Sequence, residues 1–386
     1  MQTASPAPVE VPRGLKGVVV TDTALGDVRG SEGFYHYRQY SAVELAQTRS
    51  FEDVWHLMMI GELPDAAQRA AFTARTTALR VLPPEVADAL GVIARGSRAA
   101  GALDGLRTAL SLLGAGRGFA PVYDLTPEQR REDALVAAAA VPTMLTALYR
   151  LGQGLEPVGP RTDLGYAANY LYMLTGEVPG ARETRAIEHY LISTIDHGFN
   201  ASTFTARVIA STGADVAACL VGAVGALSGP LHGGAPSRAL DTLDAIGSPD
   251  KIDPWIREAV LAGDRIMGFG HAVYRTEDPR SRMLRELAEQ EFGGPRVAFA
   301  VEVERQVEAI LAELKPGREL HTNVEFYAGV VMELCGVPRE MFTPTFAAAR
   351  VVGWGANILE QAADTKIIRP AARYVGPAPS QPVPVV

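Results

Sequence analysis

Hydrophobic side chains recur every three to four residues over most of this chain, from Ser41 almost to its end. A repeat near 3.6 residues places apolar side chains on one face of an α-helix, whereas a half-buried strand would alternate every second residue. Helix start and stop signals interrupt the repeat: Ser50 precedes an apolar run that stops at Gly61, and Asp65 opens the next one. The sequence therefore predicts a mainly all-α protein.

The beginning of the chain departs from the helical repeat. Residues 17–23 and 33–38 are β-branched or aromatic and are separated by glycines, which predicts a small N-terminal β ribbon. Residues 1–12 are rich in Ala and Pro and are expected to form a disordered tail. The run GAGRG at 114–118 lacks the preceding strand and the following Lys of a phosphate-binding loop, so it is interpreted as a flexible connection between helices.

Size and charge limit the functions that this chain can have. Its 386 residues are enough for two domains, and its hydrophobic content of 47% is ordinary for a globular enzyme. The formal net charge of −8 disfavours binding to nucleic acid or to an anionic membrane surface. Any anionic substrate must therefore be bound by a local cluster of arginines.

The cysteines and the N-terminal sequence indicate a cytoplasmic protein. Cys219 and Cys335 lie among apolar residues and are expected to be buried thiols. The first residues show no basic stretch followed by an apolar core, so no secretory signal is expected. The apolar run 134–149 is too short to span a bilayer, and a buried helix is the better interpretation.

One stretch, 266–280 with the sequence IMGFGHAVYRTEDPR, combines residue types that suit an anionic ligand. Gly268 and Gly270 let the main chain approach a ligand closely. Arg275 and Arg280 can bind carboxylate or phosphate in a bidentate manner, and His271 can donate a proton to a carbonyl oxygen. The pattern alone equally fits a glycine turn at the start of a solvated, charged helix.

Further candidates lie in other turns. His232 follows a Ser-Gly-Pro turn, and Pro236 indicates that a helix begins behind it, whose positive end would keep the imidazole neutral. His197 and Asn200 can bind a carboxylate, although the residues alone favour their capping two adjoining helices. Glu325 has apolar and aromatic neighbours and is expected to be partly buried.

Five stretches in this order resemble the citrate synthase family, from about Gly14 to about Gly376. They are GLKGVVVTDTALGDVRGSEGFYHYR at 14–38, LSGPLHGGA at 227–235, the 266–280 stretch, TNVEFYAG at 322–329, and ARVVGWGANILEQ from Ala349 with IIRP after it. The resemblance implies a citrate synthase-like, two-domain helical fold and a homodimer. A large domain for dimerisation would comprise 13–221 and 335–386, and a small domain at 222–334 would close over the active site.

The resemblance also implies an acyltransferase that converts an acyl group into an alkyl group on transfer. It would condense acetyl-CoA with oxaloacetate in the tricarboxylic acid cycle and hydrolyse the intermediate to citrate and CoA. The resemblance implies no metal or redox cofactor, and the CoA thioester would be a co-substrate. His232 and His271 would donate to the thioester and keto oxygens, and Glu325 would be the base. Oxaloacetate would be bound by His197, Asn200, Arg280, Arg350 and Arg369, the last from the partner subunit, and CoA would be bound by Met267, Gly268, Phe269, Gly270 and Arg275.

Three positions differ from the usual pattern of the family. Glu325 stands where Asp is most frequent, Asn357 stands where His is usual, and Pro236, Ser237 and Arg238 replace a common Asn-Glu pair. Two alternatives therefore stay open. The chain could be a 2-methylcitrate synthase that uses propionyl-CoA, or a catalytically weak member that acts as a ligand-binding or regulatory subunit.

Overall fold

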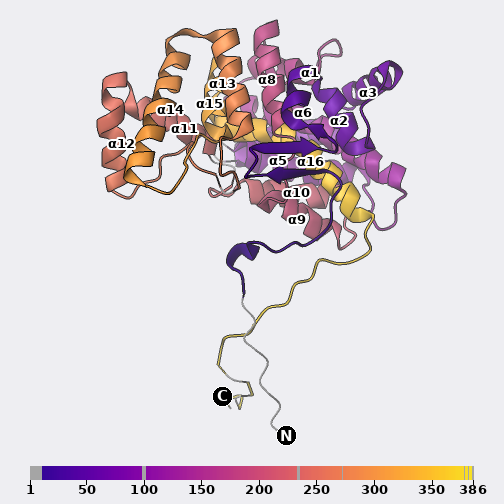
Figure 1. Cartoon of the computed structure of the whole chain (residues 1–386). Helices are drawn as coiled ribbons and strands as arrows, with labels where there is room; N and C mark the ends of the chain where they lie inside the picture. The colour runs from indigo at the N-terminus through magenta and orange to yellow at the C-terminus, as the bar shows by residue number, and fades with distance from the viewer. Residues whose placement is uncertain are drawn as a thin grey trace.

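The structure is a computed structural model that describes residues 11–97, 101–232, 235–271, 273–377, 379–380 and 382–384. Across these residues sixteen α-helices and three short strands confirm the mainly all-α fold (Figure 1). The helices are α1 (Ala42–Thr48), α2 (Phe51–Ile60), α3 (Ala66–Ala78), α4 (Pro84–Gly96), α5 (Ala102–Arg117), α6 (Pro127–Gly152), α7 (Tyr166–Thr175), α8 (Ala181–Ser193), α9 (Ala201–Ala210), α10 (Val216–Leu227), α11 (Ala235–Ile246), α12 (Ile252–Leu261), α13 (Pro279–Leu287), α14 (Gly294–Leu314), α15 (Val324–Leu334) and α16 (Phe342–Ala362).

The predicted ends of the first long helices are confirmed. The Ser50 side chain accepts a hydrogen bond from the backbone N–H of Asp53, and α2 ends at Gly61, whose φ of 110° suits glycine. Asp65 and Gln68 form a reciprocal capping box at the start of α3. Local side-chain chemistry thus sets where these helices begin and end.

The β ribbon is present, but its first strand is not where the sequence predicts it. Strands β1 (Gly26–Arg29), β2 (Phe34–Tyr37) and β3 (Tyr40–Ser41) form an antiparallel sheet in that order. The expected strand at 17–23 is wrong. Its valines are exposed, Val19 by 85%, because β2 pairs with β1 and β3 instead. β-Branched residues favour a strand only where a neighbouring strand can pair with them.

The ribbon is fixed to the end of α8. Tyr35 and Tyr37 donate their hydroxyl protons to carbonyl oxygens of residues 192–196, over distances of 2.9 to 3.1 Å. A helix leaves its last carbonyl groups without partners, and these phenols satisfy some of them. The turn between β1 and β2 then reaches the 266–280 stretch, where the N–H of Arg275 donates to the carbonyl of Gly30 (2.9 Å).

Helix α6 forms the centre of the larger group of helices. Its residues 134–148 are all buried, and it packs against α4, α5, α7 and α16. Among the described residues it is the one helix long and apolar enough to cross a bilayer, but 83% of its most apolar window is buried inside the protein. The interpretation of this run as a buried core helix is therefore confirmed.

The predicted flexible connection at 114–118 is wrong, because α5 continues through it to Arg117. A Cβ atom placed on Gly114 would lie 2.5 Å from the Cβ of Ala217 in α10. The glycine therefore allows two helices to pack closely. The helix ends only at Gly118, which has a left-handed conformation.

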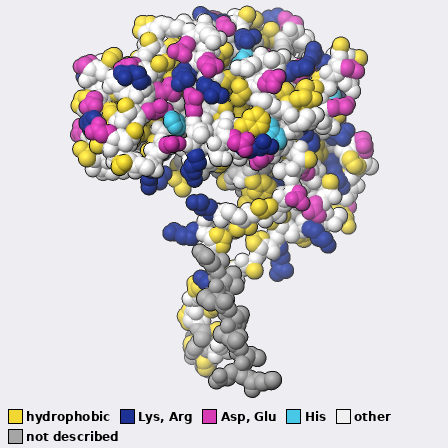
Figure 2. Space-filling model, in the orientation of Figure 1, with side chains coloured by type: hydrophobic (Ala, Val, Ile, Leu, Met, Phe, Trp, Pro, Cys, Tyr) yellow, Lys and Arg dark blue, Asp and Glu magenta, His cyan; other side chains and the backbone are white. Residues whose placement is uncertain are grey.

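The helices form two groups (Figure 1). In Figure 1, α11 to α15 lie together on one side, and α16 returns the chain to the other group. Irregular segments and the first turns of α13 and α15 lie where the groups meet. Figure 2 shows acidic and basic side chains interspersed over the visible face, without a large patch of one sign.

Candidate active site

A cavity of about 670 Å³ lies where the two groups of helices meet. Its walls come from strand β1, the segment before α9, the turn after α10, the 266–280 stretch, the first turns of α13 and α15, and the first half of α16. Predicted site residues from every one of these elements except β1 line it, namely His197, Asn200, His232, Gly270, His271, Arg280, Glu325 and Arg350. The fold thus collects side chains that are up to 153 residues apart in sequence.

Two glycines give the loop that carries His271 its backbone conformation. Gly268 and Gly270 have φ values of 88° and 83°, which side chains other than glycine rarely adopt. The N–H of Gly270 donates to the carbonyl of His321 (2.8 Å), and the carbonyl of Gly268 accepts from the N–H of Asn323 (2.9 Å). The loop is therefore tied to the segment that leads into α15.

The hydrogen bonds of His271 determine which ring nitrogen carries the proton. Its Nδ1 accepts from the backbone N–H groups of Val273 (3.0 Å) and Tyr274 (3.1 Å). Burial and the nearby Arg280 lower the pKa of His271 to about 4, so at neutral pH the ring is uncharged. A neutral ring with an acceptor at Nδ1 carries its proton on Nε2. That N–H faces a guanidinium nitrogen of Arg280 at 3.4 Å, and an oxygen that accepts from both would be stabilised between them.

Arg280 is held by a buried ion pair. Asp278 caps α13 and binds the Arg280 guanidinium through both carboxylate oxygens, at 2.7 and 3.0 Å. One of these oxygens also accepts from the backbone N–H of Val324 (3.1 Å). The pair therefore orients the arginine and joins the starts of α13 and α15.

Glu325 lies in the first turn of α15, after Asn323, whose side chain caps the helix by accepting from the Glu325 N–H (3.1 Å). Burial raises the pKa of the Glu325 carboxyl to about 7, against the opposing charges of Arg280 and Arg350. A carboxylate with a pKa near the working pH is well suited to take up and release a proton. The expected partial burial of this side chain is confirmed.

His232 is also neutral, and its position depends on a residue that the sequence analysis missed. Burial, and then the charge of Arg350, lower its pKa to about 4. Its Nε2 lies 2.9 Å from the Ser202 hydroxyl and 3.4 Å from the Ser202 backbone N–H. The Ser202 hydroxyl in turn accepts from the indole N–H of Trp354 (3.1 Å). The Ser202 backbone N–H donates to Nε2, and a neutral ring that accepts there carries its proton on Nδ1, available to a ligand. Only the position of Ser202 in the first turn of α9 could have suggested it.

The remaining cavity residues have fixed partners. His197 is half-buried, and its Nε2 lies 3.0 Å from the hydroxyl of Tyr274, another residue that the sequence analysis missed. Asn200 caps α9 by accepting from the N–H of Thr203 (3.0 Å), so its capping interpretation is confirmed although it also lines the cavity. The Arg350 side chain donates to the carbonyl of Thr194 (2.8 Å).

Five predicted residues do not line this cavity. Met267, Gly268 and Phe269 form the loop behind His271, and Arg275 lines a second cavity of about 750 Å³ with residues 317–320. His271 lines both cavities, so the two adjoin. Arg369 is exposed in the extended segment after α16 and lies outside the cavity of its own chain.

Asn357, which stands where the family usually has His, has a structural role. Its side-chain oxygen accepts from Arg207 (2.7 Å), and its amide nitrogen donates to Asp196 (3.2 Å) and to the carbonyl of Gly353 (2.8 Å). Within the described ranges no group of three or more His, Cys, Asp or Glu side chains is arranged to hold a metal ion.

Comparison with known proteins identifies the family. The family model described as the citrate synthase C-terminal domain matches residues 14–371. The chain belongs to the citrate synthase family. It is 37% identical over 366 residues to a citrate synthase of Deinococcus radiodurans, and the match covers 95% of this chain and 96% of the relative. It is also 36% identical to a 2-methylcitrate synthase of Shewanella oneidensis, covering 96% of each chain.

Solved citrate synthase structures share the fold. The Pyrobaculum aerophilum enzyme has a TM-score of 0.88 at 34% identity and covers 97% of this chain and 94% of its own. A Thermoplasma acidophilum citrate synthase was solved as a ternary complex with carboxymethyl coenzyme A and oxaloacetate. It has a TM-score of 0.88 at 28% identity, and the match covers 97% of this chain and 99% of that chain. The resemblance seen in the sequence is confirmed, and the protein is an enzyme, an acyltransferase of the citrate synthase type.

Proposed function

We propose that this enzyme condenses acetyl-CoA with oxaloacetate and hydrolyses the product to citrate and CoA, with Glu325 as the base. One observation carries the proposal. A carboxyl group with a pKa of about 7 shares a cavity with two histidines, His232 and His271, that remain neutral at that pH. Deprotonation of a carbon next to a thioester needs this combination of one base and two neutral donors.

The reaction follows from the proton positions in the cavity. Glu325 takes a proton from the methyl carbon of the thioester, and the electrons of the C–H bond form an enol or enolate. The Nδ1–H of His232 stabilises the oxygen of this enolate. The methyl-derived carbon then attacks the keto carbon of oxaloacetate, and the new alkoxide accepts from Nε2–H of His271 beside Arg280. Water finally cleaves the thioester, and CoA leaves as the thiol.

Substrate binding would use the cations and donors around the two cavities. His197, Asn200, Arg280 and Arg350 would bind the carboxylates of oxaloacetate in the smaller cavity. Arg369 would complete this set from a second copy of the chain in a homodimer, which agrees with its exposure in an extended segment. Coenzyme A would occupy the adjoining cavity, against Arg275 and the backbone of 267–270.

Closure of a small domain, 222–334, over a large domain formed by 13–221 and 335–386 would exclude water until the carbon–carbon bond exists. The two groups of helices on either side of the cavity support this division. The reaction would use no metal or redox cofactor, and the enzyme would act in the cytoplasm, in the tricarboxylic acid cycle.

A second candidate is 2-methylcitrate synthesis from propionyl-CoA, which the resemblance to the Shewanella oneidensis enzyme favours. One additional methylene in an apolar pocket changes binding by about 1 to 3 kcal/mol, so few residues separate the two activities.

Thiol release from acetyl-CoA and from propionyl-CoA, each with oxaloacetate, tests the proposal in the wild type and in Glu325→Gln. Rapid release with acetyl-CoA that falls by more than about 100-fold in the variant supports it. Faster release with propionyl-CoA would reassign the enzyme to 2-methylcitrate synthesis. Unchanged turnover in Glu325→Gln would show that another group is the base, and oxaloacetate binding without release would indicate a ligand-binding subunit.

A further inference from the structure

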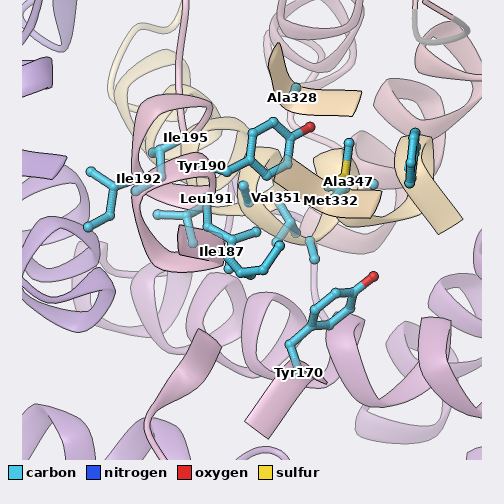
Figure 3. Close-up of a cluster of buried hydrophobic side chains, with 14 of the residues drawn as sticks. Tyr170, Ile187, Tyr190, Leu191, Ile192, Ile195, Ala328, Met332, Ala347 and Val351 are labelled. Atoms are coloured by element: carbon cyan, nitrogen blue, oxygen red, sulfur yellow. The ribbon is translucent and has the colours of Figure 1, made fainter. Parts of the chain in front are cut away.

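The hydroxyl group of Tyr190 is buried without a partner. Tyr190 lies in α8, and 1% of the residue is exposed. Among the described residues no atom forms a hydrogen bond with its hydroxyl. A buried polar group usually has a partner, because losing its hydrogen bonds to water is costly. The nearby Tyr170, in the same cluster of buried side chains (Figure 3), follows this rule, since its hydroxyl bonds to the side chain of Thr345 (2.7 Å).

The Glu325 carboxyl group is the candidate hydrogen-bond acceptor for the Tyr190 hydroxyl. Helix α15 packs against α8, and Ala328 lies three residues after Glu325, on the same side of α15. Figure 3 shows the Tyr190 ring extending from α8 with its hydroxyl on the side of Ala328. Within the part of the chain that the structure describes, the only hydrogen bond of Glu325 outside its helix is made by its backbone N–H.

Electrostatics also place the two groups near each other. Burial raises the pKa of Tyr190 well above its ordinary value, and the Glu325 carboxylate is the largest charge that raises it further. The phenol is therefore protonated at neutral pH and can donate. An ionised carboxylate can only accept, so the two groups match as donor and acceptor.

We propose that Tyr190 is a positioning residue for the base: its hydroxyl donates to the ionised carboxylate of Glu325 and holds it toward the cavity. The inference rests on the proposed role of Glu325. A hydrogen bond to an ion is stronger than one to a neutral acid. The contact would therefore favour the ionised form that accepts the substrate proton and would weaken once the proton has been transferred.

Other groups around Glu325 act on the same proton. Arg280 and Arg350 favour the ionised form, from α13 and α16, while Asp278 and burial oppose it. His232 and His271 line the same cavity and are neutral near pH 7. Removing the Tyr190 hydroxyl leaves all of these groups in place, so a change in the titration of Glu325 would report on the phenol alone.

The variant Tyr190→Phe keeps the ring and removes the hydroxyl. We expect kcat to fall about 10-fold, because a hydrogen bond to a charged group is lost. The acid limb of the pH–rate profile should move up by about one pH unit, since the ionised base loses a donor. The KM for oxaloacetate should change less than about twofold.

The matched control is Tyr170→Phe, which removes a buried hydroxyl that has a partner. It should lower Tm and leave the acid limb in place. An equal shift of the limb in both variants would show a general effect on the core and would overturn the proposal.

The double variant Tyr190→Phe with Glu325→Gln separates this inference from the proposed function. If the phenol acts through Glu325, the double variant is no slower than Glu325→Gln alone. Full activity of Glu325→Gln would refute the base itself. An inactive Glu325→Gln together with an unchanged rate and pH profile in Tyr190→Phe would refute the positioning role and leave the base in place.

Discussion

Replacing Glu325 by Gln should make the folded protein more stable at alkaline pH. The unfolded chain ionises Glu at its ordinary value of 4.5, whereas burial raises the pKa in the folded protein to about 7. The folded state therefore binds a proton that the unfolded state has lost, and stability falls as pH rises between these values. This difference in pKa between the two states corresponds to a loss of about 3 kcal/mol in the free energy of unfolding. Solvent in the accessible cavity screens the charge and reduces the expected loss to about 2 kcal/mol. Gln does not titrate, so the variant escapes this loss.

Urea unfolding at a fixed protein concentration, from pH 5 to pH 9, measures the effect. The stability of Glu325→Gln relative to the wild type should increase with pH and level off above about pH 8. The control is Glu302→Gln, on an exposed part of α14, where bonds to Arg305 and Gln306 lower the pKa. Its stability relative to the wild type should not change between pH 5 and pH 9, because Glu302 is ionised over that range in both the folded and the unfolded state. A difference between Glu325→Gln and the wild type that does not vary with pH would refute the raised pKa and the enclosure of the base.

Three further predictions follow from the site and the packing. The rate at low thioester concentration should rise as pH increases through about 7, because Glu325 must be ionised to accept the substrate proton. A pH–rate profile measures this, and a flat profile would contradict it. Tyr274→Phe removes the hydroxyl that holds His197, so the KM for oxaloacetate should rise about 10-fold. Steady-state kinetics measure this, and an unchanged KM would contradict the role of this contact. Gly353→Ala should lower the free energy of unfolding by more than about 2 kcal/mol, because the new Cβ would lie 1.9 Å from the carbonyl oxygen of Ile195. Urea unfolding measures this, and an unchanged unfolding curve would exclude the clash.

The sequence predicted helices better than it predicted contacts between them. Ser50 and Asp65 mark helix starts by their own side chains, so their effect can be read locally. The errors at 17–23 and 114–118 both depend on distant residues. The valines of 17–23 lack a strand to pair with, and Gly114 serves close packing against Ala217 instead of breaking a helix.

The same distinction applies to the site. The predicted residues of the cavity could be found because their types and order carry the chemistry, and the structure brings eight of them together. Ser202, Tyr274 and Tyr190 could not be found, because each acts on a histidine or a carboxylate that is distant in sequence. Arg369 shows a different limit, since its proposed contribution to the site of a second copy cannot be placed from the fold of one chain.

Three helix starts meet at the cavity around Glu325, the partly buried carboxylate that is the proposed base. Asn200, Asp278 and Asn323 cap α9, α13 and α15, so the positive ends of three helices point toward the same region. Burial alone would raise the pKa of Glu325 further and keep it protonated. Arg280 and then Arg350 favour its ionised form while Asp278 opposes it, and the balance leaves the pKa at about 7. The same positive field would attract a dicarboxylate substrate, so one arrangement both binds the anion and tunes the base.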